Sequence, residues 1–146
     1  MVLCLLVLSL PLFFLTRVPT PAYAATTDNL NFQARLQTGA GSIAPDGYYN
    51  VEFKLYDAST AGTLLWTSAY DYNGGAPDQR VRVANGYLTV NLGDLDAFPG
   101  TMPWDQQLYL TMNIGGTGTV ASWDGEMDPR LKLTAVPYAF NAKTAS

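Results

Sequence analysis

The chain has 146 residues, 48% of them hydrophobic, and a formal net charge of −4 from 8 basic and 12 acidic side chains. It contains no histidine, so Ser-His-Asp triads, Cys-His nucleophiles and histidine-ligated metal sites are excluded. The acidic balance, without a run of Lys and Arg, argues against a nucleic-acid partner and against anionic lipid.

The first 24 residues are interpreted as an export signal. VLCLLVLSLPLFFL is a short apolar run, and Ala22-Tyr23-Ala24 follows it as an A-x-A cleavage pattern. We expect an apolar signal-peptide helix over residues 1–24, cleavage before Ala25, and a secreted or cell-surface location. A retained membrane anchor is the alternative, but the run is short for a membrane span and Pro11 interrupts it.

Cleavage would change the composition of the chain. It removes the single cysteine, Cys4, and one basic residue, Arg17, so seven basic and twelve acidic residues remain and the net charge is about −5. Without cysteine, disulfides cannot stabilise the mature chain. We expect one domain over residues 25–142, no membrane partner after cleavage, and in residues 143–146 the start of a linker or a C-terminal tail.

Alternation of apolar and polar residues with period two runs through most of the mature chain and predicts half-buried strands. In residues 30–36 and 48–56 the expected inward side chains are Leu30, Phe32, Ala34, Leu36, Tyr49, Val51, Phe53 and Leu55. Asn50, Glu52 and Lys54 are expected to face outward. Residues 63–72 are predicted to form the returning strand, with Trp66 in the core.

The second half of the chain continues this pattern. Asn85-Gly86 stands between two alternating runs and predicts a type I′ hairpin that pairs residues 80–84 with 87–91. Residues 115–125 are expected to form a loop or a short edge strand. The further inward positions are Leu108, Leu110, Met112, Ile114, Leu131 and Leu133.

No mature segment shows a 3.6-residue apolar period with helix caps. Six to eight short strands, each with one apolar face, predict an all-β fold built as an antiparallel two-sheet β-sandwich, of jelly-roll or Ig-like type. A closed barrel is the alternative that this pattern leaves open.

Several segments resemble a β-domain near the N-terminus of many bacterial secreted and cell-surface proteins. That family opens with N-(Y/F)-Q-G-R-L and closes with P-R-x-x-L-x-S-V-P-Y-A; here the segments are NFQARL and PRLKLTAVPYA, with FKLYDA, LLW and NGYLTVNLG between them. Ala34 and Ala135 stand where the family usually has Gly and Ser. The matching motif residues are Asn31, Phe32, Gln33, Arg35, Leu36, Pro129, Arg130, Leu133, Val136, Pro137, Tyr138 and Ala139.

The resemblance implies a structural role, because the family domain often heads modular fibre or adhesin-like proteins and carries no catalytic residues. We therefore expect a non-enzymatic structural or adhesive domain whose partners are other surface or stalk modules, or a second copy of the chain. Tyr138 and Phe140 are expected to tie the last strand to the core, or to dock against a neighbouring copy. The competing interpretation of the tail is a short chain with a frayed end.

Asp124, Glu126 and Asp128 recur at period two. In an extended segment the three carboxylates would share one face, an arrangement that suits Ca²⁺. The alternative is a solvated acidic loop beside Arg130 and Lys132, and no other cofactor is expected.

The aromatic residues allow a second functional hypothesis. Trp104 and Trp123, which lie in predicted loops, with Tyr109, would form the flat stacking surface of a carbohydrate-binding module with a glycan ligand. The alternative is that these side chains fill the core or the ends of the sandwich.

Overall fold

A computed structural model describes residues 29–134. The expected signal peptide and the motif residues Val136, Pro137, Tyr138 and Ala139, together with Phe140, lie outside the described residues. Within residues 29–134, no helix is long and apolar enough to cross a membrane. All regular structure there is extended, in eight strands: β1 Leu30–Arg35, β2 Gly47–Tyr49, β3 Val51–Tyr56, β4 Leu64–Tyr70, β5 Val81–Ala84, β6 Tyr87–Leu92, β7 Tyr109–Ile114 and β8 Leu131–Lys132.

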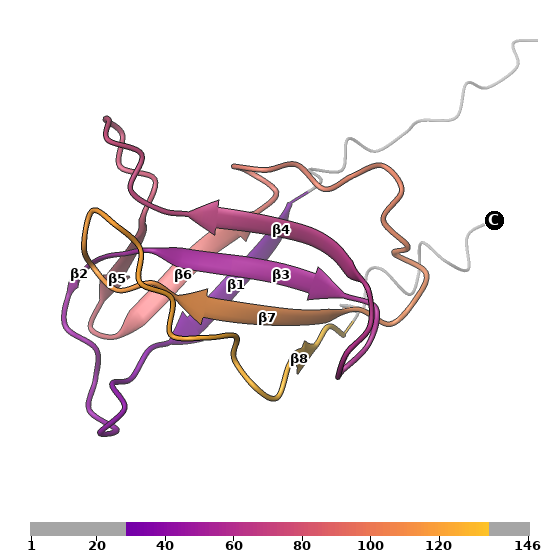
Figure 1. The fold of residues 1–146 in the computed structure, drawn as a ribbon, viewed down its shortest axis with the longest axis horizontal. Coiled ribbons are helices and arrows are strands. Elements are labelled where there is room, and N and C mark those ends of the chain that lie inside the picture. Colours follow the sequence, from indigo (N-terminus) through magenta and orange to yellow (C-terminus); the bar gives the residue numbers. More distant parts are fainter. Residues whose placement is uncertain (1–28, 135–146) are drawn as a thin grey trace, which may run out of the picture.

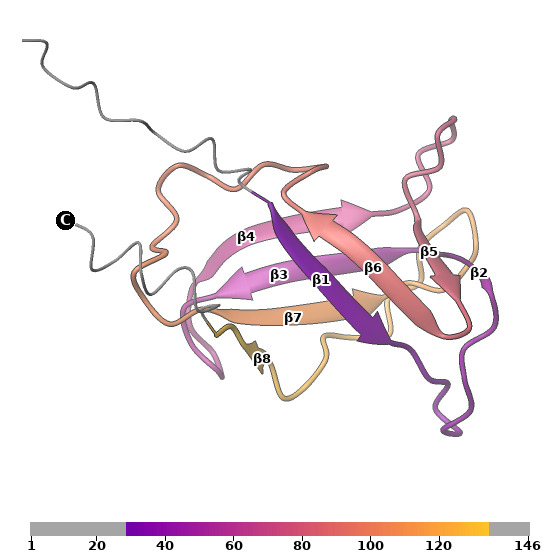
Figure 2. The ribbon, with the colours of Figure 1, turned by 180° about the vertical axis from the view of Figure 1, so that it is seen from behind.

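The strands form two antiparallel sheets of four strands each. The first sheet has the order β1-β6-β5-β2 and the second the order β4-β3-β7-β8. Figures 1 and 2 show the two sheets stacked face to face, with β1 and β6 running diagonally across β3, β4 and β7. The predicted all-β two-sheet sandwich is confirmed, and the closed-barrel alternative is wrong because each sheet ends in edge strands.

The core lies between the two sheets and contains the predicted inward side chains of β3. Phe53 is fully buried and makes edge-to-face contacts with Phe32 at 5.4 Å and with Tyr70 at 5.8 Å between ring centroids. Leu55 and Leu110 pair across β3 and β7, and both are fully buried. Each such side chain contributes roughly 1.5–3 kcal/mol relative to its exposed state, so this cluster dominates the stability of the fold.

The Asn85-Gly86 hairpin is confirmed. Both residues have positive φ, 52° and 76°, and the turn sets Ala84 opposite Tyr87 at its base. A side chain at position 86 would also collide with its surroundings, because a Cβ there would lie 2.6 Å from Cγ2 of Ile43. Glycine is therefore required at this position by backbone angle and by space.

The prediction of one continuous strand over residues 48–56 is wrong. The chain breaks at Asn50 and passes from β2 in the first sheet to β3 in the second. Asn50, expected outward, is completely buried. Its burial follows from its position at the corner between the sheets, where its polar side chain hydrogen-bonds to neighbouring loops.

The expected burial of Leu131 is also wrong, because 47% of the residue is exposed. Leu131 pairs with Leu110 and so shares its inward face, but β8 has two residues and is the last strand of its sheet within residues 29–134. Leu133 is half-buried, and its backbone N–H donates to the carbonyl of Leu108 at 2.9 Å.

The outer face of the second sheet is buried along β7 by a later segment of the chain. Thr111, on the outward side of β7, is 1% exposed and donates to the carbonyl of Met127 at 2.9 Å. Asn113 accepts a hydrogen bond from the N–H of Gly125 at 2.9 Å. Residues 124–130 therefore run beside the free edge of β7, where the backbone N–H groups of Asp124 and Met127 donate to the carbonyls of Ile114 and Met112. The outward side chains of Thr111 and Asn113 are buried under these contacts.

Candidate functional site

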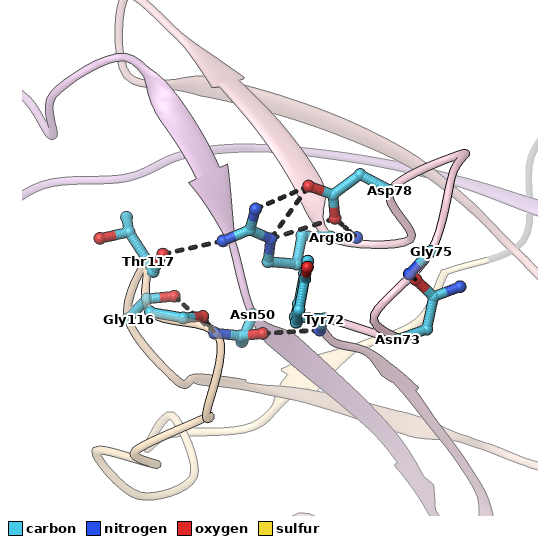
Figure 3. Close-up of polar contacts among 9 residues, drawn as sticks. Asn50, Tyr72, Asn73, Gly75, Asp78, Arg80, Gly116 and Thr117 are labelled. Carbon is cyan, nitrogen blue, oxygen red and sulfur yellow. Dashed lines mark hydrogen bonds and ion pairs between the residues drawn. The ribbon is translucent and has the colours of Figure 1, made fainter.

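One end of the sandwich is organised around the Asn50 side chain. Its Nδ2 donates to the carbonyl oxygens of Gly118 at 2.9 Å and Gly116 at 3.1 Å, and its Oδ1 accepts from the N–H of Tyr72 at 3.0 Å (Figure 3). The backbone N–H of Asn50 also donates to Gly116, at 2.8 Å. One buried amide thus fastens the loops on both sides of the corner, and we call this group of contacts the Asn50 junction.

Arg80 braces the loops beside the junction. Its guanidinium contacts Asp78 through Nη2 at 2.6 Å and Nε at 3.0 Å, and Nη1 donates to the carbonyl of Thr117 at 2.8 Å (Figure 3). The hydrogen bonds from Arg80 hold the pKa of Asp78 below its usual value, and the same contact raises the pKa of Arg80. The guanidinium also lies over the ring of Tyr72, 5.0 Å from its centroid, and 5.8 Å from that of Tyr48. Arg80 therefore links the loops that carry Asp78 and Thr117, and its charge is paired with that of Asp78.

A second polar cluster lies on the outer face of the second sheet, and we call it the Glu126 clasp. Glu126 Oε1 accepts from Lys54 Nζ at 3.0 Å and from the hydroxyl of Tyr56 at 2.9 Å. Lys54 Nζ lies 3.0 Å from Glu52 as well, so one ammonium joins two carboxylates. Burial alone would raise the pKa of Glu126, but the contacts with Lys54 and Tyr56 and the charge of Arg130 outweigh it and lower that pKa.

Arg130 completes the clasp and explains its place in the closing motif. The guanidinium stacks on the Tyr56 ring, 3.4 Å from the centroid, and donates to the carbonyls of Ala58 at 3.0 Å and Ala61 at 2.6 Å. It also lies 3.7 Å from Glu126. A planar group with five donors suits this combination of stacking and forked hydrogen bonding. Arg130 ties the C-terminal segment to the turn between β3 and β4.

The three acids considered for calcium occupy different surroundings. Glu126 points to Lys54 in the clasp, whereas Asp124 donates its backbone N–H to the carbonyl of Ile114 at 2.9 Å. Within residues 29–134, no three acidic, Cys or His side chains are grouped so as to hold a metal ion. Of the three acids, Glu126 therefore fastens this segment to the sheet through Lys54 and Tyr56.

The two loop tryptophans lie toward opposite ends of β7. Trp104 is 54% exposed and packs edge-to-face on Phe98 at 5.1 Å, which in turn contacts the buried Trp66 at 4.6 Å. Trp123 is 40% exposed and lies against Gly115, beyond the other end of the strand. The structure therefore does not gather them into one platform, and Tyr109, at the start of β7, is half-buried.

Trp66 is in the core as predicted, with 6% of its surface exposed. Its indole Nε1 donates to the carbonyl of Asp96 at 3.0 Å. This bond also holds the loop that carries Phe98 and Trp104.

The opening motif supplies both the core and the surface of the first sheet. Phe32 is buried and Leu36 half-buried, while Asn31, Gln33 and Arg35 lie exposed on the outward side of β1. Asn31 Nδ2 donates to Asn91 Oδ1 at 2.9 Å across the pair of strands. In the closing motif, Pro129 is exposed and leads into the partly buried Arg130.

Sequence reasoning missed the roles of Asn50, Asp78 and Arg80. The signal for Asn50 was an amide in the middle of an apparent strand, a position that asparagine disfavours. The signal for Arg80 was the acidic Asp78 two residues earlier, at the end of a Gly- and Pro-rich loop.

Comparison with known proteins gives a family assignment. Residues 31–130 match the model of a family described as a domain of unknown function, DUF8740. The chain belongs to this family. One of the subunits of the Na(+)-translocating NADH-quinone reductase of Yersinia pestis is similar, with 32% identity over 101 residues. The match covers 61% of this chain and 24% of that relative, so the chain spans about a quarter of the relative's length. No solved structure matches the chain.

Proposed function

We propose that this DUF8740 domain is a non-enzymatic structural and adhesive module of an exported bacterial protein, secreted or held at the cell surface. The observation that carries the proposal is the use of the charged side chains as structural ties. Asp78 is bound by Arg80, and Glu126 by Lys54 and Arg130. These groups hold loops onto the sheets.

The hydrogen bonding of the buried polar side chains supports the same role. Within residues 29–134, every buried side-chain nitrogen or oxygen has a hydrogen-bond partner. Unsatisfied buried polar groups often mark functional strain, whereas a satisfied set is what a rigid scaffold requires. The domain would act by presenting its surfaces in a fixed arrangement.

The fastening of the C-terminal segment fits a module that continues into a further element. Thr111 and Asn113 hold residues 124–130 beside β7, and Arg130 holds them against the turn between β3 and β4. Tension applied after Thr134 would be carried first by β8 and this segment, and then by the sheet. Such a connection suits the head of a stalk or fibre.

The activity of the Yersinia pestis relative belongs to that protein. Because the match covers only 24% of its length, we carry neither its redox reaction nor its sodium transport over to this chain.

Export is tested by expressing the full chain with its own leader in a bacterial host and measuring the intact mass of the fractionated product. We expect a product that begins at Ala25 in the medium or envelope, and no turnover in a panel of glycans and peptides. Ala24→Arg is the control, because a bulky charged residue in the A-x-A pattern should block cleavage. An uncleaved cytoplasmic chain would refute export, and turnover of a substrate would refute the non-enzymatic assignment.

A carbohydrate-binding module is the second candidate, and the exposure of Trp104 and Trp123 favours it. Because the two rings lie toward opposite ends of β7, each would serve a separate site. Quenching of tryptophan fluorescence by a polysaccharide, removed by Trp104→Ala or by Trp123→Ala alone, would assign the site to one loop.

A further inference from the structure

The outer face of the first sheet is exposed, in contrast to the outer face of the second sheet, which is buried along β7. We call it the open face, and define it as the outward positions of β1, β2, β5 and β6. Every one of these positions is exposed, from Asn31 on β1 to Tyr48 on β2. In Figure 2 the first sheet lies toward the viewer, and no described segment crosses it.

The charge of this face is opposite to that of the chain. Its outward strand positions include Arg35 and Arg82 and no Asp or Glu, although the chain has 12 acidic and 8 basic residues. Within residues 29–134, neither arginine forms an ion pair, and neither does Lys132 on β8, whereas Lys54, Arg80 and Arg130 all do. The two cations are therefore available to an anion from outside.

Three carboxylates at the border of the face each have a hydrogen-bond or ion-pair partner outside it. Asp46 accepts the backbone N–H of Asn85 at 2.7 Å, and Asp94 accepts a hydrogen bond from Asn29. Asp78 is held by Arg80. None of these acids is bound to an arginine of the open face.

Each free arginine is stacked on a tyrosine directly opposite it on the neighbouring strand. The Arg35 guanidinium lies 5.7 Å from the ring centroid of Tyr87, and Arg82 lies 5.3 Å from that of Tyr48. Tyr87 is 59% exposed and Tyr48 is 43% exposed. Stacking orients a guanidinium while leaving its N–H groups open to a carboxylate or sulfate.

The rest of the face carries amides and no large aliphatic side chain. Asn31 bonds to Asn91 at 2.9 Å and accepts from Gln33 at 3.3 Å, which forms a row of amides across β1 and β6. Amides and exposed tyrosines suit hydroxyl-rich rings, whereas protein interfaces usually bury an apolar centre that this face lacks. These groups favour a polysaccharide over an acidic protein.

We infer that the open face binds an acidic polysaccharide, with its anionic groups on Arg35 and Arg82 and its sugar rings against the parts of Tyr87 and Tyr48 that these guanidinium groups leave exposed. The strand spacing puts the Cα atoms of the two arginines about 12 Å apart, so one extended polymer chain spans both. The inference rests on the proposed export, since such polymers are encountered outside the cell.

The test uses the purified domain and polygalacturonate, with the fully methyl-esterified form of the same polymer as the neutral control. Isothermal titration should show binding to polygalacturonate that weakens as salt is raised, and none to the ester. Absence of binding to both polygalacturonate and dextran sulfate would overturn the inference, and so would equal binding to the ester. Binding to dextran sulfate alone would retain the open face as the binding site and identify its ligand as a sulfated polymer.

Arg35→Gln and Arg82→Gln should each weaken binding about fivefold or more, because each removes a charge-assisted hydrogen bond. Lys132→Gln is the matched control: it removes one exposed cation from the second sheet and should leave binding unchanged. Thermal melts must show that all three variants stay folded. An equal loss of binding in Lys132→Gln would mean that only net charge matters. A loss of binding confined to Trp104→Ala or Trp123→Ala would place the site in the loops. Either result overturns the inference.

A second copy of the chain is the competing occupant. If light scattering shows a dimer that Arg35→Gln dissociates, the open face is a self-association surface and the polysaccharide inference is wrong. Because these titrations use purified protein, their failure is distinguishable from a failure of export, which fractionation measures separately.

Discussion

Replacement of Asn50 is the sharpest test of how the two sheets are joined. Asn50→Ala removes a completely buried amide that donates to Gly116 and Gly118 and accepts from Tyr72. Asn50→Asp keeps the size and the acceptor for Tyr72, but it replaces the donor with a charged oxygen that faces two carbonyl oxygens. The two variants therefore separate loss of a contact from reversal of its polarity.

The contacts set the expected magnitudes. Each lost hydrogen bond with a buried partner left unpaired costs about 1–3 kcal/mol, and since the Gly118 and Tyr72 bonds are only partly buried we expect about 2–4 kcal/mol for Asn50→Ala. That is a large part of the roughly 5–15 kcal/mol that stabilises a domain, and it corresponds to a fall in Tm of about 10 °C. Asn50→Asp should cost more at neutral pH, about 3–5 kcal/mol, because it buries an unpaired charge.

The stability difference between Asn50→Asp and the wild type should depend on pH. Burial and the facing carbonyls would raise the pKa of the introduced carboxyl above its unfolded value of about 3.9. A raised folded pKa means that the native state binds the proton more tightly, so the deficit of Asn50→Asp relative to the wild type should shrink as the pH falls from 7 toward 4.

Urea unfolding at pH 7 and pH 4, followed by tryptophan fluorescence, measures these differences. Asn91→Asp is the matched control, because Asn91 is exposed and its change should stay within about 0.5 kcal/mol. If Asn50→Asp were as stable as the wild type at pH 7, the Asn50 junction would not hold the two sheets together.

Three further predictions concern the clasp and the hairpin. Arg130→Ala should lower the stability by about 1–3 kcal/mol and expose the C-terminal segment to limited proteolysis, Arg130→Lys should not restore it, and Lys132→Ala should be silent. Glu126→Gln should cost no more than about 1 kcal/mol at pH 7 in urea unfolding. Since the folded pKa of Glu126 lies below its usual value, the difference should disappear as the pH falls through that folded pKa. Gly86→Ala should cost about 1–2 kcal/mol in a thermal melt, whereas Gly100→Ala, which has open space around it, should be near neutral; equal effects would contradict the strain argument.

Most of the fold could be predicted because its signals are local. Period-two alternation and the Asn85-Gly86 turn depend on neighbouring residues, and both are confirmed. The sheet change at Asn50 could not be seen, because Tyr49 and Val51 point inward on either side of the corner and the alternation continues unbroken. The exposure of Leu131 could not be seen either, since alternation sets the face of a residue and not whether another sheet covers it.

The candidate site was less predictable because its partners are distant in sequence. The closing motif indicated Arg130, but the groups it binds, Tyr56, Ala58 and Ala61, lie about seventy residues earlier. Likewise the acidic pattern around Glu126 suggested calcium, whereas the cation that the structure places beside Glu126 is Lys54. Only the order of strands in the second sheet brings these residues together.

The two sheets use their charges in different ways, and this difference bears on which face meets a ligand. On the second sheet, Lys54 is paired with Glu52 and Glu126, and Arg130 is paired with Glu126, while residues 124–130 are held beside β7. On the first sheet no described segment needs holding, and its outward positions include arginines and no acids. A face that was merely solvated would be expected to carry both signs, as soluble surfaces generally do. Within residues 29–134, the open face carries two arginines without an ion pair and no acid, whereas the second sheet carries both signs, with Lys132 as its cation outside any ion pair. An anion that binds the open face would account for this one-sided charge.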